Sequence, residues 1–512
     1  MSQKFRFSYQ QNINERASDC WIFPTFAPSY IKACLFMYMK VGLLALLLAS
    51  VGSATAQKQN KLNSFVEYGA TVRTGDNTPL WQVSNLQGLA SLDNSTYIRG
   101  GVFYNDRWGK WDVKAGLDVI AAAGFSSGIQ QAYADFRYKW FGIFAGSKEM
   151  TAPLINSRLS SGELTWSGNS RPIPQIMIGI PEYLYLLPRL AIKGEISYGW
   201  FTDSNWLKDH ANVAGGAWYT KNIKYHHKEG FVRIGVPDGK WQLDFGMTLD
   251  TEFGGQRVTS SGEVDLGNTL KDYFRIFIPG SADEDKPAND ALFYQGNFVG
   301  TEQIRGTYRG KDFSISAYLD NYFEDFSAMG KQNGWDGLWG IELKFNNFRP
   351  INNVVLEFLQ TTNQSGPLHG LHEPEDGPVH KTGGSDNYYN NGLYHGWAHW
   401  GMANGNPLLR SPIYNEDGSM SFKYNRVKAL HVGWSGEFSD KWNYIAKMSF
   451  NRTWGTHGTP TLDILENFSA YVAFQYMPDK QKTWLIHASL GLDTGEIYGD
   501  NLGFQMRIRK AF

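Results

Sequence analysis

The chain has 512 residues, and its 48 basic and 49 acidic side chains leave a formal net charge of −1. This balance gives no support to a nucleic-acid partner, which needs a basic surface. Aromatic residues make up 15% of the chain, more than a soluble enzyme of this length normally carries, and they suit β-strands and the girdles of a membrane barrel.

A secretory signal peptide is predicted over residues 39–56. Met39 and Lys40 give a charged start, residues 41–51 are apolar, and residues 54–56 (Ala-Thr-Ala) supply the small side chains of a cleavage site. The alternative is a membrane anchor that stays attached, which the shortness of the apolar run disfavours. We therefore expect the protein to be exported.

The predicted signal divides the chain into three parts. Residues 1–38 are interpreted as an upstream extension that results from a start codon assigned too early, and residues 57–512 as a single mature domain. Both cysteines, Cys20 and Cys34, fall in the upstream extension. The mature domain is therefore expected to lack disulfides, thiol nucleophiles and cysteine-ligated metals.

The mature domain alternates apolar and polar side chains in segments of about ten residues, the pattern of strands with two different faces. Residues 111–119, 241–249 and 442–450 are examples, and each apolar row opens on a tryptophan, where a membrane-interface girdle is expected. Soluble sandwiches also alternate, but their strands are usually shorter. No later apolar run could cross a bilayer as a helix, so a membrane protein here must be a closed barrel. We predict an all-β fold, a transmembrane antiparallel β-barrel in a bacterial outer membrane.

The final strand carries a second signal. Phe504, Met506, Ile508, Lys510 and Phe512 share one face, and the chain ends at Phe512. A terminal aromatic on such a strand resembles the signal by which the outer-membrane assembly machinery recognises its substrates. This machinery, contacted through Phe512, and the outer-membrane lipid are therefore predicted partners.

The number of strands is predicted from the links between them, because outer-membrane barrels alternate short periplasmic turns with longer outer loops. Between a strand ending near Phe201 and one opening near Phe231, the alternation requires one more strand, which we assign to residues 218–225. The result is about 18 strands, with a short periplasmic helical link at 202–216. The long extracellular loops are predicted at 74–94, 122–128, 148–189, 252–300, 322–335, 362–425, 452–467 and 493–501.

The predicted inward faces carry charges of both signs. One dominant sign often marks the constriction of a selective channel, whereas mixed signs suit a lumen crossed by ion pairs or filled by inserted loops. Another interpretation is that these side chains only solvate and stiffen the barrel. The residues are Glu67, Arg73, Arg99, Asp112, Lys114, Asp118, Asp135, Arg137, Lys193, Glu195, Asp244, Glu342, Lys344, Glu357, Lys447, Arg507 and Arg509.

Two predicted outer segments are rich in aromatic, amide and hydroxyl side chains. The first, residues 161–175, reads SGELTWSGNSRPIPQ, and the second, residues 388–408, contains YYNNG, YHGW and GNPL. Such side chains can stack on the apolar faces of sugars and pair with their hydroxyls; the alternative is that they build a loop plug with Trp166 packed beneath it. The candidate polysaccharide-binding residues are Trp166, Asn169, Arg171, Tyr388, Tyr389, Asn390, Asn391, Tyr394, Trp397 and Trp400.

The SGNSRPIPQ segment at 167–175 and the GNP turn at 405–407 resemble the capsule-assembly Wzi family. The resemblance runs over most of the mature chain, from the first strand to Phe512. It implies an outer-membrane barrel of eighteen strands that holds surface polysaccharide on the cell, with lectin-like behaviour and no known chemistry. The outer loops at 252–300 and 362–425 are longer than the family leads us to expect.

The remaining chemical motifs are weak. His369, His372, His380, His395 and His399 could ligate a metal, but no pair lies on a predictable scaffold, and we expect a solvated loop. Serines near 160–167 have no spacing that implies a Ser-His-acid set. We expect no enzyme, cofactor or metal, and predict a protein that binds or organises capsular or other surface polysaccharide. The alternatives are a diffusion channel for small saccharides and, less favoured, an enzyme acting on lipid or glycan.

Overall fold

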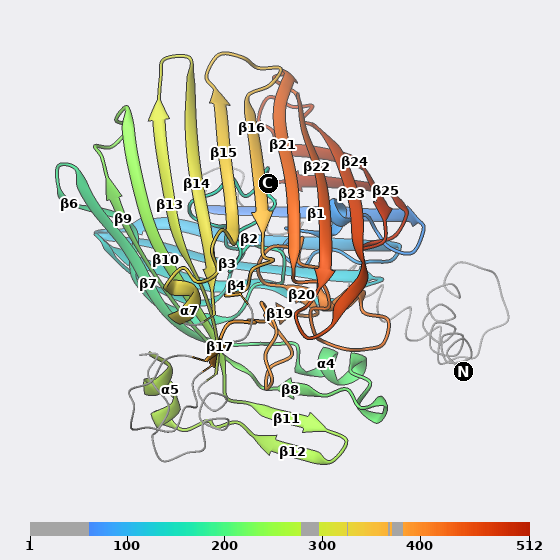
Figure 1. The fold of residues 1–512 in the computed structure, drawn as a ribbon. Coiled ribbons are helices and arrows are strands. Elements are labelled where there is room, and N and C mark those ends of the chain that lie inside the picture. Colours follow the sequence, from blue (N-terminus) through green and yellow to red (C-terminus); the bar gives the residue numbers. More distant parts are fainter. Residues whose placement is uncertain (1–60, 278–295, 325, 367–368, 371–381) are drawn as a thin grey trace, which may run out of the picture.

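The structure, a computed structural model, describes residues 61–277, 296–324, 326–366, 369–370 and 382–512. Eighteen antiparallel strands form one barrel, which is closed because β1 pairs with both β2 and the last strand, β25 (Figure 1). The prediction of a closed barrel with this number of strands is confirmed. The upstream extension, the signal peptide and residues 57–60 lie outside the described residues.

The barrel strands are β1 (Leu62–Thr74), β2 (Ser95–Trp108), β3 (Trp111–Ala123), β4 (Gly128–Tyr138), β5 (Phe141–Ser147), β6 (Gln175–Leu187), β7 (Leu190–Trp200), β9 (Lys224–Ile234), β10 (Trp241–Phe253), β13 (Asn297–Arg309), β14 (Phe313–Phe323), β15 (Gly337–Phe345), β16 (Asn353–Gln360), β21 (Val427–Ser439), β22 (Trp442–Gly455), β23 (Pro460–Tyr476), β24 (Trp484–Gly495) and β25 (Asn501–Ala511). Each pairs with its neighbour in the chain, so the barrel is a simple up-and-down meander.

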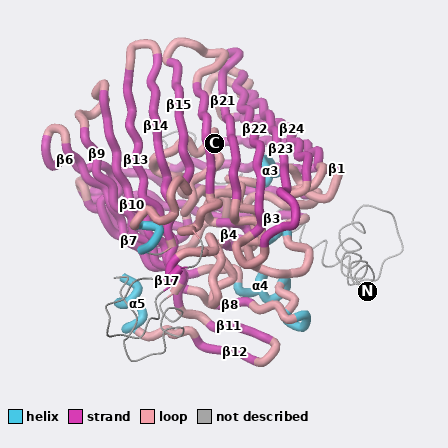
Figure 2. Tube along the Cα trace, viewed as in Figure 1, coloured by secondary structure: helices cyan, strands magenta, loops and turns pink. Residues whose placement is uncertain are grey.

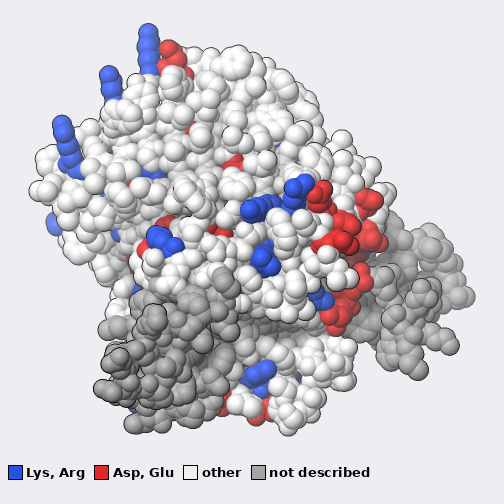
Figure 3. Space-filling view, viewed as in Figure 1, with Lys and Arg blue, Asp and Glu red and all other residues white. Residues whose placement is uncertain are grey.

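The two faces of the strands differ as the alternation predicts. On β10, Trp241 and Phe245 are exposed on the outside, whereas Asp244 and Asp250 are buried inside the barrel. On β25, Phe504 is exposed on the outer face and Gln505 is buried. On the face seen in Figure 3, the upper part of the outer wall carries few charged side chains below the blue and red residues at its rim. An apolar outside and a polar inside are what a barrel immersed in lipid requires.

The two ends of the barrel are unlike. The links at one end are short turns, whereas most of the loop structure gathers at the other end and inside the barrel (Figure 2). Aromatic side chains ring the short-turn end, where such girdles mark the membrane interface. The exposed tryptophans at or beside the short turns are Trp108, Trp111, Trp140, Trp241, Trp442 and Trp484.

The prediction that residues 148–189 form a single outer loop is wrong, because this range contains strand β6. The strand pairs with β5 and β7, and residues 188 and 189 form a short turn. Its ladder shifts register between Ile180 and Leu184, around Pro181, which has no N–H to donate. The proline and the unbroken apolar run Ile176–Met177–Ile178 hide the alternation in the sequence.

Strand β6 supplies the eighteenth strand, so the assignment of residues 218–225 as a separate barrel strand is also wrong, and Lys224 and Tyr225 instead open β9. Tyr219–Lys221 (β8) instead pairs with β11 (Gln256–Thr259) in a separate sheet of three strands, which β12 (Gly262–Asp265) completes. The predicted helix exists as α4 (Ser204–His210), but it lies at the long-loop end beside β8 rather than among the short turns (Figure 1). The link at 202–216 therefore belongs to the long-loop end and not to the short-turn end, where it is predicted.

The other elements of the long-loop end are short. They are α3 (Leu80–Val83), η1 (Val213–Gly215), α5 (Leu270–Phe277), α7 (Phe326–Met329), β17 (His369–Gly370), β18 (Thr382–Gly383), β19 (Ala398–His399), β20 (Met402–Ala403) and η2 (Pro412–Tyr414). No helix in the part of the chain that the structure describes is long and apolar enough to cross a membrane.

Candidate functional site

Residues 148–174, which link β5 to β6, cross the lumen to the opposite wall. Leu164 N donates to Asp320 Oδ2 on β14 (2.7 Å), and Ser160 Oγ donates to Glu357 Oε1 on β16 (2.5 Å). Further down, Asn156 Nδ2 donates to Glu342 Oε1 on β15 (2.9 Å). Because Glu342 lies near the short-turn end of its strand, this segment spans the lumen from the outer mouth toward the periplasmic one.

The first sequence motif, within residues 161–175, and the second, within residues 388–408, are two halves of one structure. Asn169 Nδ2 donates to the carbonyl of Ala403 (3.0 Å), and Ser170 Oγ donates to Asn404 Oδ1 (2.6 Å). Asn406, from the GNP turn, donates through Nδ2 to the carbonyl of Gly162 (2.5 Å). Each pairing joins positions more than two hundred residues apart in the chain.

A third segment, residues 75–94, inserts beside the other two. Two hydrogen bonds join its short helix α3 to the inner wall. Leu80 N donates to Asp493 Oδ2 (2.9 Å), and Trp81 Nε1 donates to Ser449 Oγ (3.2 Å). Asn85 joins it to the first motif, because its backbone N donates to Asn169 Oδ1 (3.0 Å). We call residues 75–94, 148–174 and 384–426 together the plug.

The plug has an apolar core of its own inside the barrel. Tyr388, Tyr389 and Trp397 are fully buried. The ring of Tyr388 packs on that of Tyr322 from the wall at 4.7 Å between centroids, and the ring of Tyr389 packs on that of Phe422 at 5.0 Å. Burial of aromatic rings of this size is a large stabilising contribution. The motif segments therefore fold as a compact body rather than as free surface loops.

Six of the ten candidate binding residues are buried in the plug: Asn169, Arg171, Tyr388, Tyr389, Tyr394 and Trp397. Their polar atoms largely serve the plug itself; Trp397 Nε1, for example, donates to the carbonyl of Thr165 (2.6 Å). The partly exposed candidates are Trp166, Asn390, Asn391 and Trp400. Of these, Asn390 is occupied by two hydrogen bonds of 2.8 Å to the backbone of Phe422.

The expectation of a solvated histidine loop is wrong for the two histidines nearest the motif. His395 and His399 are buried in the plug, and burial lowers the pKa of both, that of His395 to about 4. The Nε2 of His399 lies 3.1 Å from the backbone N–H of Thr202, and its Nδ1 lies 2.9 Å from the carbonyl of Arg171. A neutral ring that accepts at Nε2 and donates at Nδ1 satisfies both contacts. His372 and His380 lie outside the described residues.

One group at the long-loop end joins the first motif, the second motif and helix α4. Arg171 stacks its guanidinium over the ring of Trp400, 4.8 Å from the centroid. The backbone N of Trp400 donates to Asp203 Oδ2 (2.9 Å), the residue before α4, and Trp206 of α4 packs against Gly401. Trp206 in turn stacks on His210 at 4.1 Å. We call Arg171, Trp206, His210 and Trp400 the outer aromatic patch.

Sequence reasoning identified Arg171 and Trp400 of this patch but missed Trp206 and His210. Both lie in the link at 202–216 that the strand count had placed on the periplasmic side. The available signal was the spacing of the two rings, four residues apart on a predicted helix, which places them on one face. Burial lowers the pKa of Arg171 to about 10, so its guanidinium stays charged at neutral pH.

The lumen carries paired charges of both signs, as the sequence predicts. Arg99 pairs with Asp118 across neighbouring strands and with Glu149 at the start of the plug segment. Such pairs brace the wall and hold the inserted segment, so the structure combines the ion-paired and the loop-filled interpretations. The other pairs of the inner wall are Arg137 with Asp135 (3.2 Å), Lys193 with Glu229 (2.9 Å), Arg233 with Asp244 (2.6 Å) and Arg305 with Glu342 (2.5 Å).

Comparison with known proteins gives structural likeness only. No protein-family model and no curated protein matches the chain. Among solved structures, the barrel is similar to Escherichia coli Wzi, described as an outer-membrane protein involved in group 1 capsule assembly and a carbohydrate-binding β-barrel. The identity is 12%, the match covers 88% of this chain and 84% of that one, and the TM-score is 0.51.

Two further solved structures give weaker matches. OccAB4 of Acinetobacter baumannii is 10% identical, with 90% and 99% of the two chains covered and a TM-score of 0.46. OccK11 of Pseudomonas aeruginosa is 7% identical, with 88% and 95% covered and a TM-score of 0.43.

The chain is a bacterial outer-membrane β-barrel. Three features require a lipid bilayer around the protein: the closed ring of strands, the apolar outer wall and the tryptophan girdle. This location makes the short-turn end periplasmic and places the outer aromatic patch on the cell surface.

Proposed function

We propose that this barrel binds or organises capsular or other surface polysaccharide at the cell surface and catalyses no reaction on it. The observation that carries the proposal is the stacking of Arg171 on Trp400, because it brings one residue from each motif together at the long-loop end. The partly exposed indole of Trp400 offers an apolar face for a sugar ring. The exposed His210, stacked on Trp206, adds a polar ring to the patch.

The likeness to Wzi supports the same proposal. That protein is described as carbohydrate-binding and as involved in capsule assembly, and the SGNSRPIPQ and GNP segments of this chain resemble those of its family. Here the segments form the base of the outer aromatic patch. We propose that the chain is a distant member of this family and shares its role in retaining polysaccharide.

The alternative is a diffusion channel for small saccharides. The plug supports the polysaccharide role instead, because residues 148–174 bond to the far wall at several depths of the lumen. Planar-bilayer recordings separate the two: a plugged barrel passes little ion current, whereas an open barrel of this many strands passes a large one. A steady conductance of the porin type would favour the channel.

Deletion of the gene in the encapsulated host tests the role directly. We expect polysaccharide to be made in normal amount but released into the medium, and the wild-type gene on a plasmid to restore retention. Polysaccharide that stays on the deleted cells in full amount would contradict the proposal. Incubation of the purified barrel with labelled polysaccharide tests the absence of catalysis, since shortening of the chains would revive an enzymatic role.

A further inference from the structure

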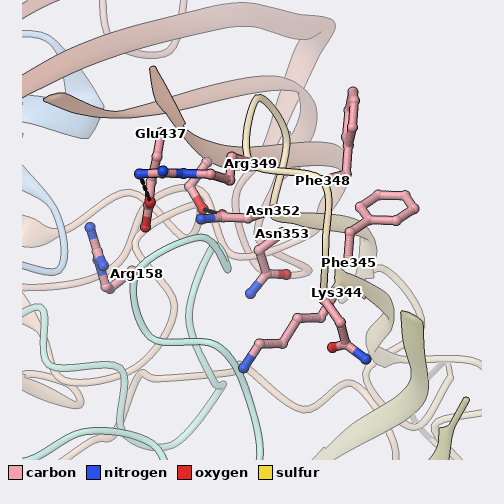
Figure 4. Close-up of a pocket in the computed structure, with 10 residues that line it drawn as sticks. Arg158, Lys344, Phe345, Phe348, Arg349, Asn352, Asn353 and Glu437 are labelled. Carbon is pink, nitrogen blue, oxygen red and sulfur yellow. Dashed lines mark hydrogen bonds and ion pairs between the residues drawn. The ribbon is translucent and has the colours of Figure 1, made fainter. Parts of the chain in front are cut away.

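A pocket of about 480 Å³ opens at the periplasmic end of the lumen, beside the turn that joins β15 to β16. Figure 4 shows Arg158, Lys344, Asn353 and Arg349 around the open space, with Glu437 beside Arg349. Arg158 comes from the plug, whereas the others come from the wall and its turn. The plug therefore adds one cationic side chain to a pocket that the wall and its turn otherwise form.

The neighbours of Arg158 fix this part of the plug in place. Asn156 bonds to Glu342 on β15 (2.9 Å), and the carbonyl of Leu159 accepts a hydrogen bond from His431 Nε2 on β21 (2.7 Å). The backbone on both sides of Arg158 is thus tied to the wall. Its exposed guanidinium is presented to the pocket from a rigid support.

The charges of the pocket do not cancel. Arg349 is already paired with Glu437 (3.0 Å) and Asp440 (2.6 Å), and Glu342 is paired with Arg305. Among the residues that the structure describes, no carboxylate lies within ion-pair distance of Arg158 or Lys344. Two segments of the chain therefore bring two uncompensated cations to one pocket, which favours an anionic ligand.

We propose that this pocket binds the carboxylate group of an acidic saccharide at the periplasmic mouth. Arg158 and Lys344 meet the carboxylate. Ser435 and the amides of Asn352 and Asn353 also line the pocket. Ser435 Oγ donates to Asn352 Oδ1 (2.9 Å), which leaves the Nδ2 group of Asn352 and the lone pairs of Ser435 to suit sugar hydroxyls. The volume lies within the range typical of small-ligand sites.

A lipid headgroup fits the pocket less well than a saccharide. Arg158 belongs to a segment inside the barrel, whereas the exposed ring of Phe348 lies on the other side of the β15–β16 turn (Figure 4). A lipid would have to place its phosphate in the lumen while its acyl chains stayed outside the wall. A soluble saccharide entering from the periplasm meets no such conflict.

The experiment measures binding by the mature full-length barrel in detergent, using isothermal titration calorimetry. The probes are trigalacturonate, neutral maltotriose and inorganic phosphate. We expect trigalacturonate to bind at least about tenfold more tightly than maltotriose, and Arg158→Gln and Lys344→Gln each to weaken it about tenfold, the loss of one charge-assisted hydrogen bond. Lys480→Gln is the control, because it removes an exposed cation at the same end but outside the pocket.

Equal affinity of Arg158→Gln, Lys344→Gln and wild type for trigalacturonate would overturn the inference, as would binding of phosphate but not of the uronate. The two variants lie on different segments, so a folding defect in one leaves the other as a test. The inference rests on the proposed saccharide role, and Trp400→Ala separates the two. Suppose that Trp400→Ala loses surface-polysaccharide binding, while Arg158→Gln and Lys344→Gln bind trigalacturonate as wild type does. The proposed polysaccharide role would then be supported, and the proposed carboxylate site in the pocket would be wrong.

Discussion

Trp397 Nε1 donates a hydrogen bond of 2.6 Å to the carbonyl oxygen of Thr165, across 232 positions of the chain. The indole is fully buried, so the bond is shielded from water, and its loss would leave a buried carbonyl without that donor. The bond joins the two motifs at the centre of the plug. Their aromatic and amide-rich composition is thus explained first by the fold, and the outer aromatic patch is the part left for a ligand.

Weakening the contact between the motifs should open the barrel. In Asn406→Ala the donors to Gly162 O and Ser161 Oγ are lost, which costs about 1–3 kcal/mol for buried partners. We expect planar-bilayer conductance above that of wild type and faster proteolysis within residues 148–174. Asn415→Ala is the control, because the bonds of Asn415 stay within its own loop; equal conductance in both variants would refute the idea.

The plug should lose stability as pH rises. Burial, and next the nearby charge of Asp320, raise the pKa of Glu163 well above its usual 4.5. A raised folded-state pKa gives stability that is complete below the unfolded pKa and is lost as pH increases through the folded value. Urea unfolding in detergent should therefore show Glu163→Gln more stable than wild type at about pH 8 and similar to it at about pH 4.

The exposed Asp463→Asn is the control for this experiment, since it removes a carboxylate that lies in solvent. It should follow wild type at both pH values. If Glu163→Gln also follows wild type throughout, Glu163 is not held in its neutral form in the plug.

The outer aromatic patch should carry the affinity for surface polysaccharide. Trp400→Ala removes the stacking face and the partner of Arg171, and we expect affinity for purified polysaccharide to fall about tenfold, which corresponds to about 1.4 kcal/mol. Trp335→Ala is the matched control, because Trp335 is an exposed indole at the same end of the barrel outside the patch. Equal losses in the two variants would mean that binding is not localised to the patch.

Phe512 should matter for assembly more than for stability. Its backbone N donates to the carbonyl of Ser64 on β1 (2.9 Å), while its ring is exposed on the lipid-facing side. We expect Phe512→Ala to lower the amount of folded, heat-modifiable barrel in the outer membrane several-fold while leaving refolding in detergent unchanged. Phe504→Ala, on the same face of β25, should assemble normally; if it fails to the same extent, loss of apolar surface is the cause.

The barrel could be predicted from the sequence because successive side chains of a strand face the lipid and the lumen in turn, and their polarity alternates accordingly. The prediction failed at β6, where Pro181 breaks the ladder and three consecutive apolar residues hide which side chain faces inward. Met177 is buried against the plug, while Ile176 and Ile178 face lipid. An apolar side chain stands on the inner face of β6 at this point, so the period of two disappears there.

The site was predicted only in part, because a plug core and a sugar-binding surface draw on the same residue types. Tyr388 and Trp397 are aromatic whether they stack on a sugar or on rings of the protein itself, as they do on Tyr322 and Tyr225. Only the long-range pairing of the two motifs decides between these uses. His395 and His399 illustrate the same point, since a histidine-rich loop reads as solvated until its burial is known. No local pattern contains that information.

The path of residues 148–174 has a consequence for how the protein is made. Ser160 bonds to Glu357, 197 positions later, and accepts from Lys447, 287 positions later, so its partners emerge from the secretion machinery long after it does. Contacts so distant in sequence form late and slowly. During passage through the periplasm residues 148–174 remain without these partners, and we expect a holding chaperone to protect them until the later strands arrive.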